Sequence, residues 1–519
     1  MLIKTFASAV HGVDARTITI EINTGGHKQV EQGSFYQIVG LPDKTVSEGM
    51  ARIEAATKNT GFQVKRLHTI VNLAPANVRK EGSAYDLPIA LGLLAASKQI
   101  VAPEIDKYII MGELSLDGSL RPIKGALPIA IQARKEQFKG FILPKANARE
   151  AAIVNDLDVY GVETLHDAIA LLIGESTLEP TAVDTRDDFF DNRDNYDVDF
   201  SDVKGQENVK RALELAAAGG HNVILIGPPG AGKTMLARRM PTILPPLNLH
   251  EALETTKIHS VSGLMQDGSA LLTTRPFRSP HHTISDVALV GGGSNPMPGE
   301  ISLAHNGVLF LDELPEFKRS VLEVMRQPME ERKVTISRAR ITVDYPANFL
   351  LFASMNPCPC GYYNHPDKEC VCGPGVVKRY LNKISGPLLD RIDLHVEVTP
   401  VSYDELSSNA RAERGSKDIA QRVDESRRVQ AERFQSYPGV YCNAQMPSRL
   451  VREVCTLQPE GLALLKKAMK IQKLSARAYD RILKVARTSA DLDGSKAIEL
   501  PHIAEAIQYR SLDKEGWAG

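Results

Sequence analysis

The chain has 519 residues, of which 43% are hydrophobic and 24% are charged, and its formal net charge is -1. This length allows about three domains, and the composition is that of a globular protein, which excludes a disordered or fibrous one. A near-neutral charge gives no overall basic field, so a nucleic-acid partner would be held by a local patch or a pore. No apolar run approaches the ~18 residues of a membrane span, and no signal-peptide pattern is found, which indicates a cytosolic protein.

The first region, residues 1–175, mixes the patterns of strands and helices. Ile18, Ile20 and Ile22 alternate with polar residues, which predicts a half-buried strand. Small and apolar residues recur at helical spacing between positions 46–57. The mixture predicts an α/β or α+β domain.

Two segments of this region, residues 80–90 and 112–125, resemble the proteolytic domain of Lon-type proteases. The catalytic dyad of those proteases requires a nucleophilic serine and a lysine base, whereas the matching positions here hold Ala84 and Leu127. We therefore predict a Lon-protease-like domain without peptidase activity. The alternative, in which Ser83 is the nucleophile and a lysine of the same segments is its base, stays open.

An acidic linker follows at residues 176–199. Hydrophobic periodicity is lost here, and aspartates recur through its second half. A charge run with little apolar content is usually a solvated tether. We therefore place a domain boundary in this linker.

Residues 200–400 contain the first motif of a nucleoside triphosphatase. The segment GPPGAGKT matches the phosphate-binding pattern GxxxxGK[ST] and lies between an apolar run and a helical pattern. Its glycines allow backbone N–H groups to surround phosphate oxygens at a helix N-terminus. We expect Lys233 to reach the β and γ phosphates and Thr234 to hold Mg²⁺. The expected nucleotide contacts are Gly227, Pro228, Pro229, Gly230, Ala231, Gly232, Lys233, Thr234 and Asp312.

The second motif is an apolar run that ends in two carboxylates, Asp312 and Glu313. Asp312 is expected to bind Mg²⁺, and Glu313 is expected to act as general base toward the attacking water. A third apolar run, residues 348–354, leads to Asn356, whose amide would orient the same water. The order of the motifs is that of a P-loop ATPase, so the sequence predicts ATP hydrolysis.

Between the two motifs, residues 244–299 exceed the length of a simple crossover and are rich in glycine and proline. Arg278, His281 and His282 lie in this insertion. Two hypotheses stay open: a loop that contacts DNA in the pore of a ring, with Arg278 as a candidate contact, or a loop that packs between subunits. Adjacent histidines point apart in a strand or loop, which favours polar contacts over metal binding for this pair.

Residues 331–343 predict a β-hairpin with cations near its tip. We expect Lys333, Arg338 and Arg340 to bind DNA phosphates in a central channel. The alternative is an ordinary solvated hairpin.

Four of the six cysteines form two close pairs, CPCG and CVCG. Cys358, Cys360, Cys370 and Cys372 offer four thiolates, which suit a tetrahedral Zn²⁺ site, and the glycine after each pair permits a tight turn. Four protein ligands leave no open position, so this zinc would be structural. Reduced thiols without metal are the alternative.

Two arginines complete the predicted ATPase site. Arg391 is expected to be an arginine finger that reaches the γ phosphate of a neighbouring subunit, and a local ion pair is the alternative.

Residues 401–519 show helical spacing and predict a helical lid. Ser475 is the expected N-cap of one lid helix, which places Arg477 in a first turn where a cation is disfavoured. Arg477 is therefore expected to contact nucleotide phosphate of its own chain, with Arg481 as the alternative.

From end to end, the chain resembles the magnesium-chelatase-like AAA+ ATPase family. The specific motifs are the Lon-like first region, FRSPHHT at 277–283, the two cysteine pairs and SGPLLDRID at 385–393. The resemblance implies a Lon-protease-like α/β N-terminal domain, an AAA+ P-loop core with a parallel sheet, and a C-terminal helical lid. It also implies a cytoplasmic homohexamer that uses ATP and Mg²⁺ as a DNA helicase. Such a motor would promote branch migration on branched and single-stranded DNA, and so integrate incoming single strands during natural transformation.

Two other functions stay open. A metal-insertion ATPase similar to a magnesium chelatase subunit shares the core, but the sequence shows no resemblance to a porphyrin-binding subunit. An ATP-dependent protease is disfavoured by Ala84 and Leu127. The stimulus for ATP hydrolysis distinguishes the three: branched or single-stranded DNA, a chelatase partner, or unfolded protein.

Overall fold

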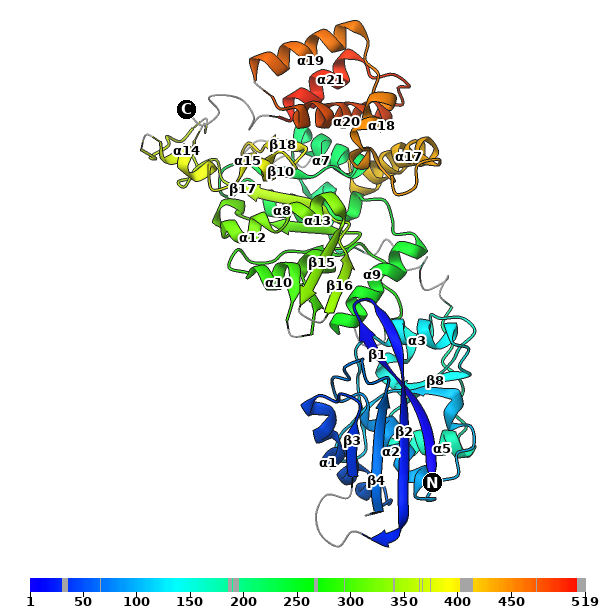
Figure 1. The fold of residues 1–519 in the computed structure, drawn as a ribbon. Helices are drawn as coiled ribbons and strands as arrows, with labels where there is room; N and C mark the ends of the chain where they lie inside the picture. The colour runs from blue at the N-terminus through cyan, green and yellow to red at the C-terminus, as the bar shows by residue number, and fades with distance from the viewer. Residues whose placement is uncertain are drawn as a thin grey trace. The chain divides into compact units, whose positions relative to one another are not determined.

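The protein is represented by a computed structural model (Figure 1). The chain forms two compact units, Met1–Asn192 with Leu249–Thr273, and Arg193–Asn248 with Thr274–Gly519. Each unit is considered by itself. The described residues are 1–29, 36–65, 67–184, 189, 196–265, 269–293, 295–338, 341–363, 365, 367–373, 375–401, 414–472 and 474–510.

The first unit contains one mixed sheet and one small ribbon. The strands of the sheet are β1 (Leu2–His11), β2 (Asp14–Gln29), β3 (Tyr36–Val39), β4 (Leu67–Ala74), β5 (Tyr108–Ile110), β8 (Gly140–Pro144) and β9 (Asp158–Val162). Their order is β3-β4-β2-β1-β5-β8-β9. Pairing is antiparallel between β1 and β2 and between β2 and β4, and parallel elsewhere in the sheet. The ribbon pairs β6 (Glu113–Leu114) with β7 (Leu120–Arg121).

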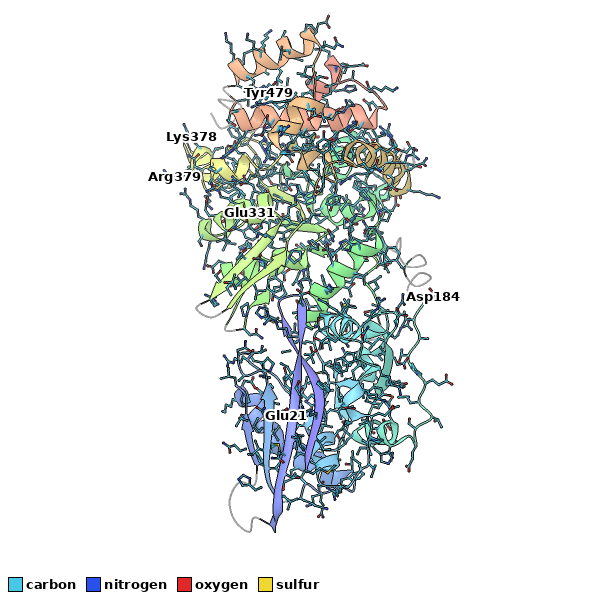
Figure 2. The ribbon with its side chains drawn as sticks, turned by 45° about the vertical axis from the view of Figure 1, so that its right-hand side comes forward. Glu21, Asp184, Glu331, Lys378, Arg379 and Tyr479 are labelled. Carbon is cyan, nitrogen blue, oxygen red and sulfur yellow. The ribbon has the colours of Figure 1, made fainter. Side chains whose placement is uncertain are left out.

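The strand predicted from alternating isoleucines is confirmed as part of β2. Ile18, Ile20 and Ile22 are fully buried, whereas the intervening Glu21 is partly exposed and lies beside Lys4 (Figure 2). Because side chains alternate across a strand, one face of β2 joins the core and the other meets solvent. The mixed α/β character predicted for this region is therefore confirmed.

The helices of the first unit pack on its sheet or on one another. They are α1 (Lys44–Asn59), α2 (Asp86–Ala96), α3 (Ala126–Lys135), α4 (Lys145–Ala151), α5 (Leu165–Ile173) and α9 (Leu249–Ser262). Every residue of α2 is buried, which explains its continuous apolar sequence. The helix α9 belongs to this unit although its sequence lies within the range expected for the ATPase core. The Gly125 amide, at the start of α3, donates a hydrogen bond to the Ser260 carbonyl in the last turn of α9.

A parallel sheet forms the centre of the second unit. Its strands are β11 (Phe277–Arg278), β14 (Val308–Leu311), β17 (Leu350–Met355), β10 (Val223–Ile226) and β18 (Leu394–Glu397), in that spatial order. All neighbouring pairs are parallel, and β10, β14 and β17 are entirely buried. Two ribbons accompany the sheet: β12 (Gly291–Gly292) with β13 (Met297–Pro298), and β15 (Lys333–Arg338) with β16 (Ile341–Pro346). The second ribbon is the hairpin predicted from the sequence.

Helices of the second unit surround the sheet and form the helical region predicted at the C-terminal end. Those of the core are α7 (Glu207–Gly219), α8 (Lys233–Arg239), α10 (Asp286–Val290), α11 (Glu300–Leu303), α12 (Arg319–Glu323), α13 (Arg326–Glu331), α14 (Val376–Leu381) and α15 (Gly386–Leu389). Those of the C-terminal region are α17 (Ser416–Phe434), α18 (Ser448–Val454), α19 (Pro459–Ile471), α20 (Ala476–Leu492) and α21 (Leu500–Gln508). Ser475 caps α20, as predicted, by accepting a hydrogen bond from the Ala478 amide. Across the described ranges, none of the helices has the length and apolar character that a membrane span requires.

The end of the acidic linker is bound to the second unit. Asp199 caps a short helical turn and accepts a hydrogen bond from the Ser416 amide at the start of α17. The Arg239 guanidinium donates to the Asp199 carbonyl and pairs with Asp202 at 2.7 Å. The aspartates at 187, 188, 191 and 194 lie outside the described residues. The described end of the linker is therefore docked, whereas the sequence predicts a solvated tether.

Candidate ATPase site

The predicted nucleotide-binding residues meet at one edge of the parallel sheet. The chain leaves β10 at Gly227, β14 at Asp312 and β17 at Asn356, and the carboxyl ends of parallel strands lie side by side. A pocket of about 400 Å³ opens there. It is lined by Pro229, Gly230, Ala231, Gly232, Lys233, Thr234, Met235, Asp312, Glu313, Ser354, Met355 and Asn356.

Glycines shape the loop that encloses this pocket. Gly230 and Gly232 have φ values of 80° and 82°, which other residues adopt only with strain. A Cβ at Gly227 would lie 2.5 Å from the Val398 carbonyl oxygen, so this position excludes a side chain. The loop leads into α8, whose N-terminus points its free N–H groups toward an anion. This geometry is that of a phosphate-binding loop.

Lys233 is fixed by oxygen atoms at the floor of the pocket. Its Nζ donates to the carbonyls of Gly227 at 2.7 Å and Pro228 at 2.9 Å, and to Asn356 Oδ1 at 3.1 Å. Burial lowers the pKa of Lys233, and the carboxylates of Asp312 and Glu313 oppose this shift. The predicted lysine and asparagine are therefore brought together within one pocket.

The predicted Mg²⁺ residues also lie together. Thr234 Oγ1 donates to Asp312 Oδ2 at 2.9 Å, and Ser354 Oγ donates to Asp312 Oδ1. A hydroxyl and a carboxylate beside a phosphate loop are oxygen ligands of the kind that Mg²⁺ prefers, so these residues fit the ion. Sequence reasoning missed Ser354. The sequence feature that could have indicated it is a single hydroxyl residue in the apolar run of β17, the strand that pairs with β14 before Asp312.

Glu313 follows Asp312 with an unusual backbone conformation. Its φ of 53° lies in the left-handed region, which is costly for a residue with a Cβ. Its side chain is 54% exposed and lines the pocket, where a general base would meet water. His282 lies nearby, with Nδ1 at 3.8 Å from Glu313 Oε2. His281 instead contacts Thr283 Oγ1 at 2.9 Å, and the two imidazole rings lie 4.1 Å apart at their centroids, whereas the sequence predicts that adjacent histidines point apart.

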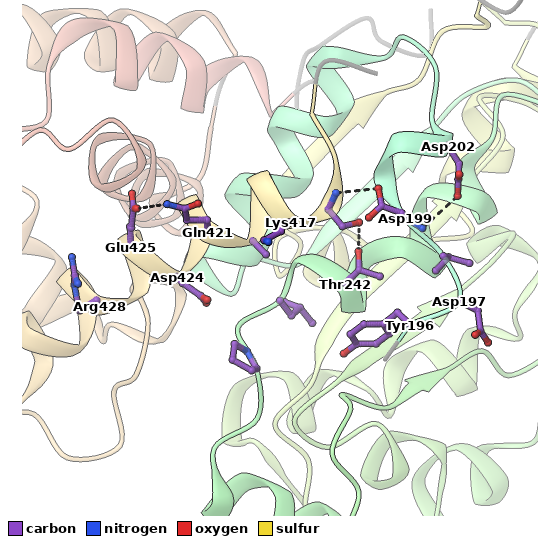
Figure 3. Close-up of a pocket in the computed structure, with 15 residues that line it drawn as sticks. Tyr196, Asp197, Asp199, Asp202, Thr242, Lys417, Gln421, Asp424, Glu425 and Arg428 are labelled. Atoms are coloured by element: carbon purple, nitrogen blue, oxygen red, sulfur yellow. Dashed lines mark hydrogen bonds between the residues drawn. The ribbon is translucent and has the colours of Figure 1, made fainter. Parts of the chain in front are cut away.

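A larger cavity of about 940 Å³ lies elsewhere in the second unit (Figure 3). It is bordered by residues 196–202, Thr242 and the first half of α17, and carboxylates dominate its polar lining. None of its lining residues belongs to the phosphate loop or to the segments directly after β14 and β17 that carry Asp312, Glu313 and Asn356. We therefore assign nucleotide binding to the smaller pocket.

Arg391 lies at the opposite edge of the sheet from the phosphate loop. Arg391 precedes β18, which pairs in register with β10, whereas the phosphate loop follows β10. The amino and carboxyl edges of the sheet are therefore separated by the length of a four-residue strand, about 10 Å. The Arg391 side chain is 7% exposed, pairs with Glu330 at 2.5 Å and donates to the Pro387 carbonyl at 2.6 Å. Burial lowers the pKa of Arg391, and Glu330 opposes this. The residue is too far from its own phosphate loop to contact the nucleotide there.

Arg477 lies at the same edge as Arg391, and its contact with the nucleotide of its own chain stays a prediction. Its guanidinium is 62% exposed and 4.0 Å from Asp390. Neither Arg477 nor the alternative, Arg481, is among the described residues that line the nucleotide pocket. Arg481 pairs with Asp393. Burial alone would raise the pKa of Asp393, but Arg481 and His221 hold it well below its usual range.

The four predicted metal ligands are brought together. The sulfur atoms of Cys358, Cys360, Cys370 and Cys372 all lie within 4.8 Å of one another. Cys358 Sγ is 3.2 Å from Cys360 Sγ and 3.7 Å from Cys370 Sγ. Tetrahedral zinc with ~2.3 Å bonds places its sulfur ligands ~3.8 Å apart, so the donor set fits Zn²⁺. The nearby helix α14 presents two exposed cations, Lys378 and Arg379 (Figure 2).

The side chains predicted to contact DNA differ in their exposure and in their ion pairs. Arg338 is exposed near the hairpin tip, and Lys333 is half-exposed and 3.4 Å from Asp344. Arg340 lies outside the described residues. Arg278 forms two hydrogen bonds of 2.7 Å with Glu300 and is partly buried. Because Glu300 takes the Nε and Nη2 donors of this guanidinium, we do not propose Arg278 as a DNA contact.

The Lon-like region holds no serine and lysine pair among its described residues at the positions that resemble the protease. Ser83 Oγ donates to a Glu113 carboxylate oxygen. Lys80 is fully buried, and its Nζ donates to the carbonyls of Gly40, Leu73 and Pro75. Burial lowers the pKa of Lys80, but its proton-bearing nitrogen faces backbone oxygens. The absence of peptidase chemistry stays a prediction from Ala84 and Leu127.

The fold and the site define a P-loop ATPase. Comparison with known proteins identifies its family. Family models described as "Magnesium chelatase, subunit ChlI", "Subunit ChlI of Mg-chelatase" and "Magnesium chelatase, subunit ChlI C-terminal" match residues 199–406, 27–147 and 413–510 respectively. The chain is 42% identical to competence protein ComM of Haemophilus influenzae over 98% of this chain and 97% of that protein. It is also 42% identical to the Escherichia coli protein YifB over 98% of this chain and 96% of that one.

The chain therefore belongs to the ComM and YifB family of magnesium-chelatase-like AAA+ ATPases. ATP and Mg²⁺ are the cofactors that this family implies. A shorter match of 31% identity, which covers 27% of this chain and 26% of the other protein, relates it to Lon protease 2 of Bacillus subtilis. The expected combination of a Lon-like part with an AAA+ core and a helical region is confirmed.

Proposed function

We propose that the protein is an ATP-driven DNA motor that promotes branch migration on branched DNA during natural transformation. A relative that is 42% identical over 98% of this chain is a competence protein. Competence involves uptake of DNA strands, and the integration of such strands requires joints between DNA molecules to move. The ATPase site supplies the energy source for this movement.

The observation that carries the proposal is the separation of the nucleotide pocket from the arginines. Lys233, Glu313 and Asn356 lie at the carboxyl edge of the sheet, whereas Arg391 and Arg477 lie at the amino edge. Phosphoryl transfer needs a cation on the γ phosphate, and arginine fingers commonly supply it. We propose that each subunit supplies these arginines to its neighbour in a closed ring, and that the ring is a homohexamer.

The proposed DNA contact is the hairpin β15–β16. Arg338 lies at the end of β15 and is exposed, and Lys333 lies on the same strand. Arginine and lysine that face DNA phosphates release counterions, so binding by this hairpin would weaken as salt rises. We expect Arg338→Glu to reduce DNA affinity more than Lys333→Gln, because Lys333 is already beside Asp344.

The experiment is strand release from a labelled Holliday junction in the presence of ATP and Mg²⁺. Wild-type protein is expected to separate the junction and to hydrolyse ATP faster when the junction is present. Glu313→Gln is expected to bind the junction without separating it. If junction DNA changes neither ATP turnover nor its own structure, the DNA motor proposal is wrong and the ATPase assignment remains.

A metal-insertion ATPase is the second candidate, because the matching family models describe a magnesium chelatase subunit. This reading predicts that ATP turnover responds to a chelatase partner and not to DNA. The same turnover assay therefore separates the two candidates. Unfolded protein serves as the third stimulus and tests for an ATP-dependent protease.

We also propose that the cysteine cluster holds one structural Zn²⁺ per chain. Cys370→Ser removes one of the four thiolates and is expected to abolish bound zinc and lower the melting temperature. Cys442→Ser is the matched control, because Cys442 is a buried free cysteine outside the cluster. Metal analysis of folded, reduced wild-type protein provides the decisive measurement, and protein without zinc would rule out the site.

A further inference from the structure

We infer that residues 358–383, which we call the cysteine segment, position the nucleotide pocket for ATP hydrolysis: Gly361 supports the phosphate loop and Tyr380 supports Asn356. This role rests on the ATP hydrolysis that the proposed function requires and is independent of DNA binding. The cysteine segment starts two residues after Asn356 and contains the four clustered cysteines and the helix α14. Its described residues are 358–363, 365, 367–373 and 375–383.

The first contact joins the cysteine segment to the phosphate loop. Gly361 follows the first cysteine pair, and its amide donates to the Cys358 carbonyl at 3.0 Å, which closes a turn. Its φ is 85°, and a Cβ at this position would lie 2.6 Å from Cδ of Pro229, a residue that lines the nucleotide pocket. The glycine therefore permits both the turn and the close approach to the phosphate loop, and a side chain here would push on the loop.

The second contact involves the inward face of α14. Val377 and Tyr380 are buried and lie three residues apart, so they share one face of the helix. Lys378 and Arg379, which lie between them in the sequence, are exposed (Figure 2). The helix therefore presents its cations to solvent and packs Tyr380 against the core of the second unit.

Tyr380 lies among groups of the ATPase site. Its side chain is buried, which raises its pKa, and the carboxylates of Glu316 and Glu313 raise this pKa further. An interaction with the Asn356 backbone opposes the shift. Asn356 Oδ1 in turn accepts a hydrogen bond from Lys233 Nζ at 3.1 Å. One residue thus separates Tyr380 from the lysine of the phosphate loop.

Further contacts of the cysteine segment keep α14 in place. The four cysteine sulfur atoms before α14 lie within 4.8 Å of one another. After α14, Lys383 Nζ pairs with Glu316 at 3.1 Å and lies 5.4 Å from the centroid of the Tyr380 ring. A helix of six residues has little stability of its own, so these contacts determine where α14 lies. Because the Lys383–Glu316 pair is half-exposed and such pairs contribute little, we assign the positioning to the buried Tyr380.

Tyr380 and Gly361 act on different steps. Tyr380 is not among the described residues that line the pocket, so it acts through Asn356, which is expected to orient the attacking water. A displacement of about 1 Å at such a residue can slow a reaction by about 10²-fold. Gly361 instead contacts the loop that holds the phosphates. Loss of the Tyr380 hydroxyl should therefore lower kcat, and a side chain at Gly361 should weaken ATP binding.

The first test compares Tyr380→Phe with Tyr362→Phe in kcat and KM for ATP. Tyr380→Phe keeps the packed ring and is expected to lower kcat by about 2- to 10-fold, the range for one net hydrogen bond, with KM within about twofold. Tyr362→Phe is the matched control, because its ring keeps the contacts with His365 and Lys368, and it is expected to match wild type. When Asn356 is already alanine, Tyr380→Phe is expected to have no further effect on kcat, because it acts through the Asn356 amide.

The second test compares Gly361→Ala with Gly375→Ala in the binding of a fluorescent ATP analogue. Both glycines have left-handed backbone, with φ values of 85° and 75°, but a Cβ at Gly375 would meet no atom within 4 Å. The two variants therefore share the backbone strain, and only Gly361→Ala pushes on Pro229. We expect Gly361→Ala to bind the analogue about fivefold or more weakly than Gly375→Ala, the lower end of the cost of inserting a methyl group into a packed site.

Either comparison can overturn the inference. Equal kcat in the two tyrosine variants, or a full effect of Tyr380→Phe when Asn356 is alanine, would show that Tyr380 does not position Asn356. Equal affinity of the two glycine variants would show that the segment does not support the phosphate loop. If wild type hydrolyses no ATP with or without the Holliday junction, the proposed function fails, and analogue binding still decides the contact with the loop. If melting curves show that Gly361→Ala is unfolded, the tyrosine comparison decides.

Discussion

Glu313→Gln is expected to leave ATP binding intact and to reduce ATP hydrolysis by at least about 10²-fold, the lower range for a lost general base. Glutamine keeps the size of the side chain but cannot accept a proton from water. Lys233, Thr234 and Asp312 keep their hydrogen bonds in this variant, because none of them is donated to or accepted by the Glu313 side chain. Turnover under saturating ATP, together with equilibrium binding of a fluorescent ATP analogue, measures the two effects separately.

The matched control for this variant is Glu316→Gln. Glu316 lies three residues further along the same segment and pairs with Lys383 at 3.1 Å, outside the nucleotide pocket. It is expected to hydrolyse ATP at close to the wild-type rate. Near-wild-type turnover by Glu313→Gln would contradict the general-base assignment, and loss of ATP binding would show that Glu313 instead shapes the pocket.

The core of the site could be predicted because its chemistry depends on local sequence. Gly230 and Gly232 adopt left-handed backbone, and Lys233 and Thr234 follow them within one turn of helix, so one short motif contains the whole loop. Asp312 was predictable because it ends an apolar strand. Ser354 was harder to find, since its role depends on β17 lying beside β14, a pairing that only the folded sheet reveals.

Two expectations about arginine side chains depended on partners that sequence spacing does not show. Arg477 was assigned to its own nucleotide from the helix dipole, but this argument requires only some anionic partner, and Asp390 lies 4.0 Å away. Arg278 was considered for DNA because it lies in a glycine-rich insertion, yet Glu300, more than twenty residues later, accepts hydrogen bonds from its Nε and Nη2. The partners of charged side chains were set by tertiary contacts that sequence spacing does not contain. The packing of α9 with the first unit is of the same kind.

Mixing two inactive variants is expected to restore ATP hydrolysis if the arginines act across subunits. Lys233→Ala loses the ammonium that contacts the β and γ phosphates and is expected to be unable to bind ATP. Arg477→Ala and Arg391→Ala are each expected to bind ATP and to hydrolyse it at least about 10²-fold more slowly, since a lost arginine finger costs 10³–10⁵-fold in related chemistry. In a mixed ring, an intact phosphate loop of an arginine variant can lie beside the intact arginines of a Lys233→Ala subunit.

A substitution at Glu330 distinguishes the two arginines. Arg477 is 62% exposed, whereas Arg391 is 7% exposed and must leave Glu330 before it can contact another subunit. Glu330→Gln is therefore expected to raise wild-type turnover if Arg391 is the finger, and to leave it unchanged if Arg477 alone serves. Turnover that stays at the sum of the separate variants at every mixing ratio would contradict shared sites.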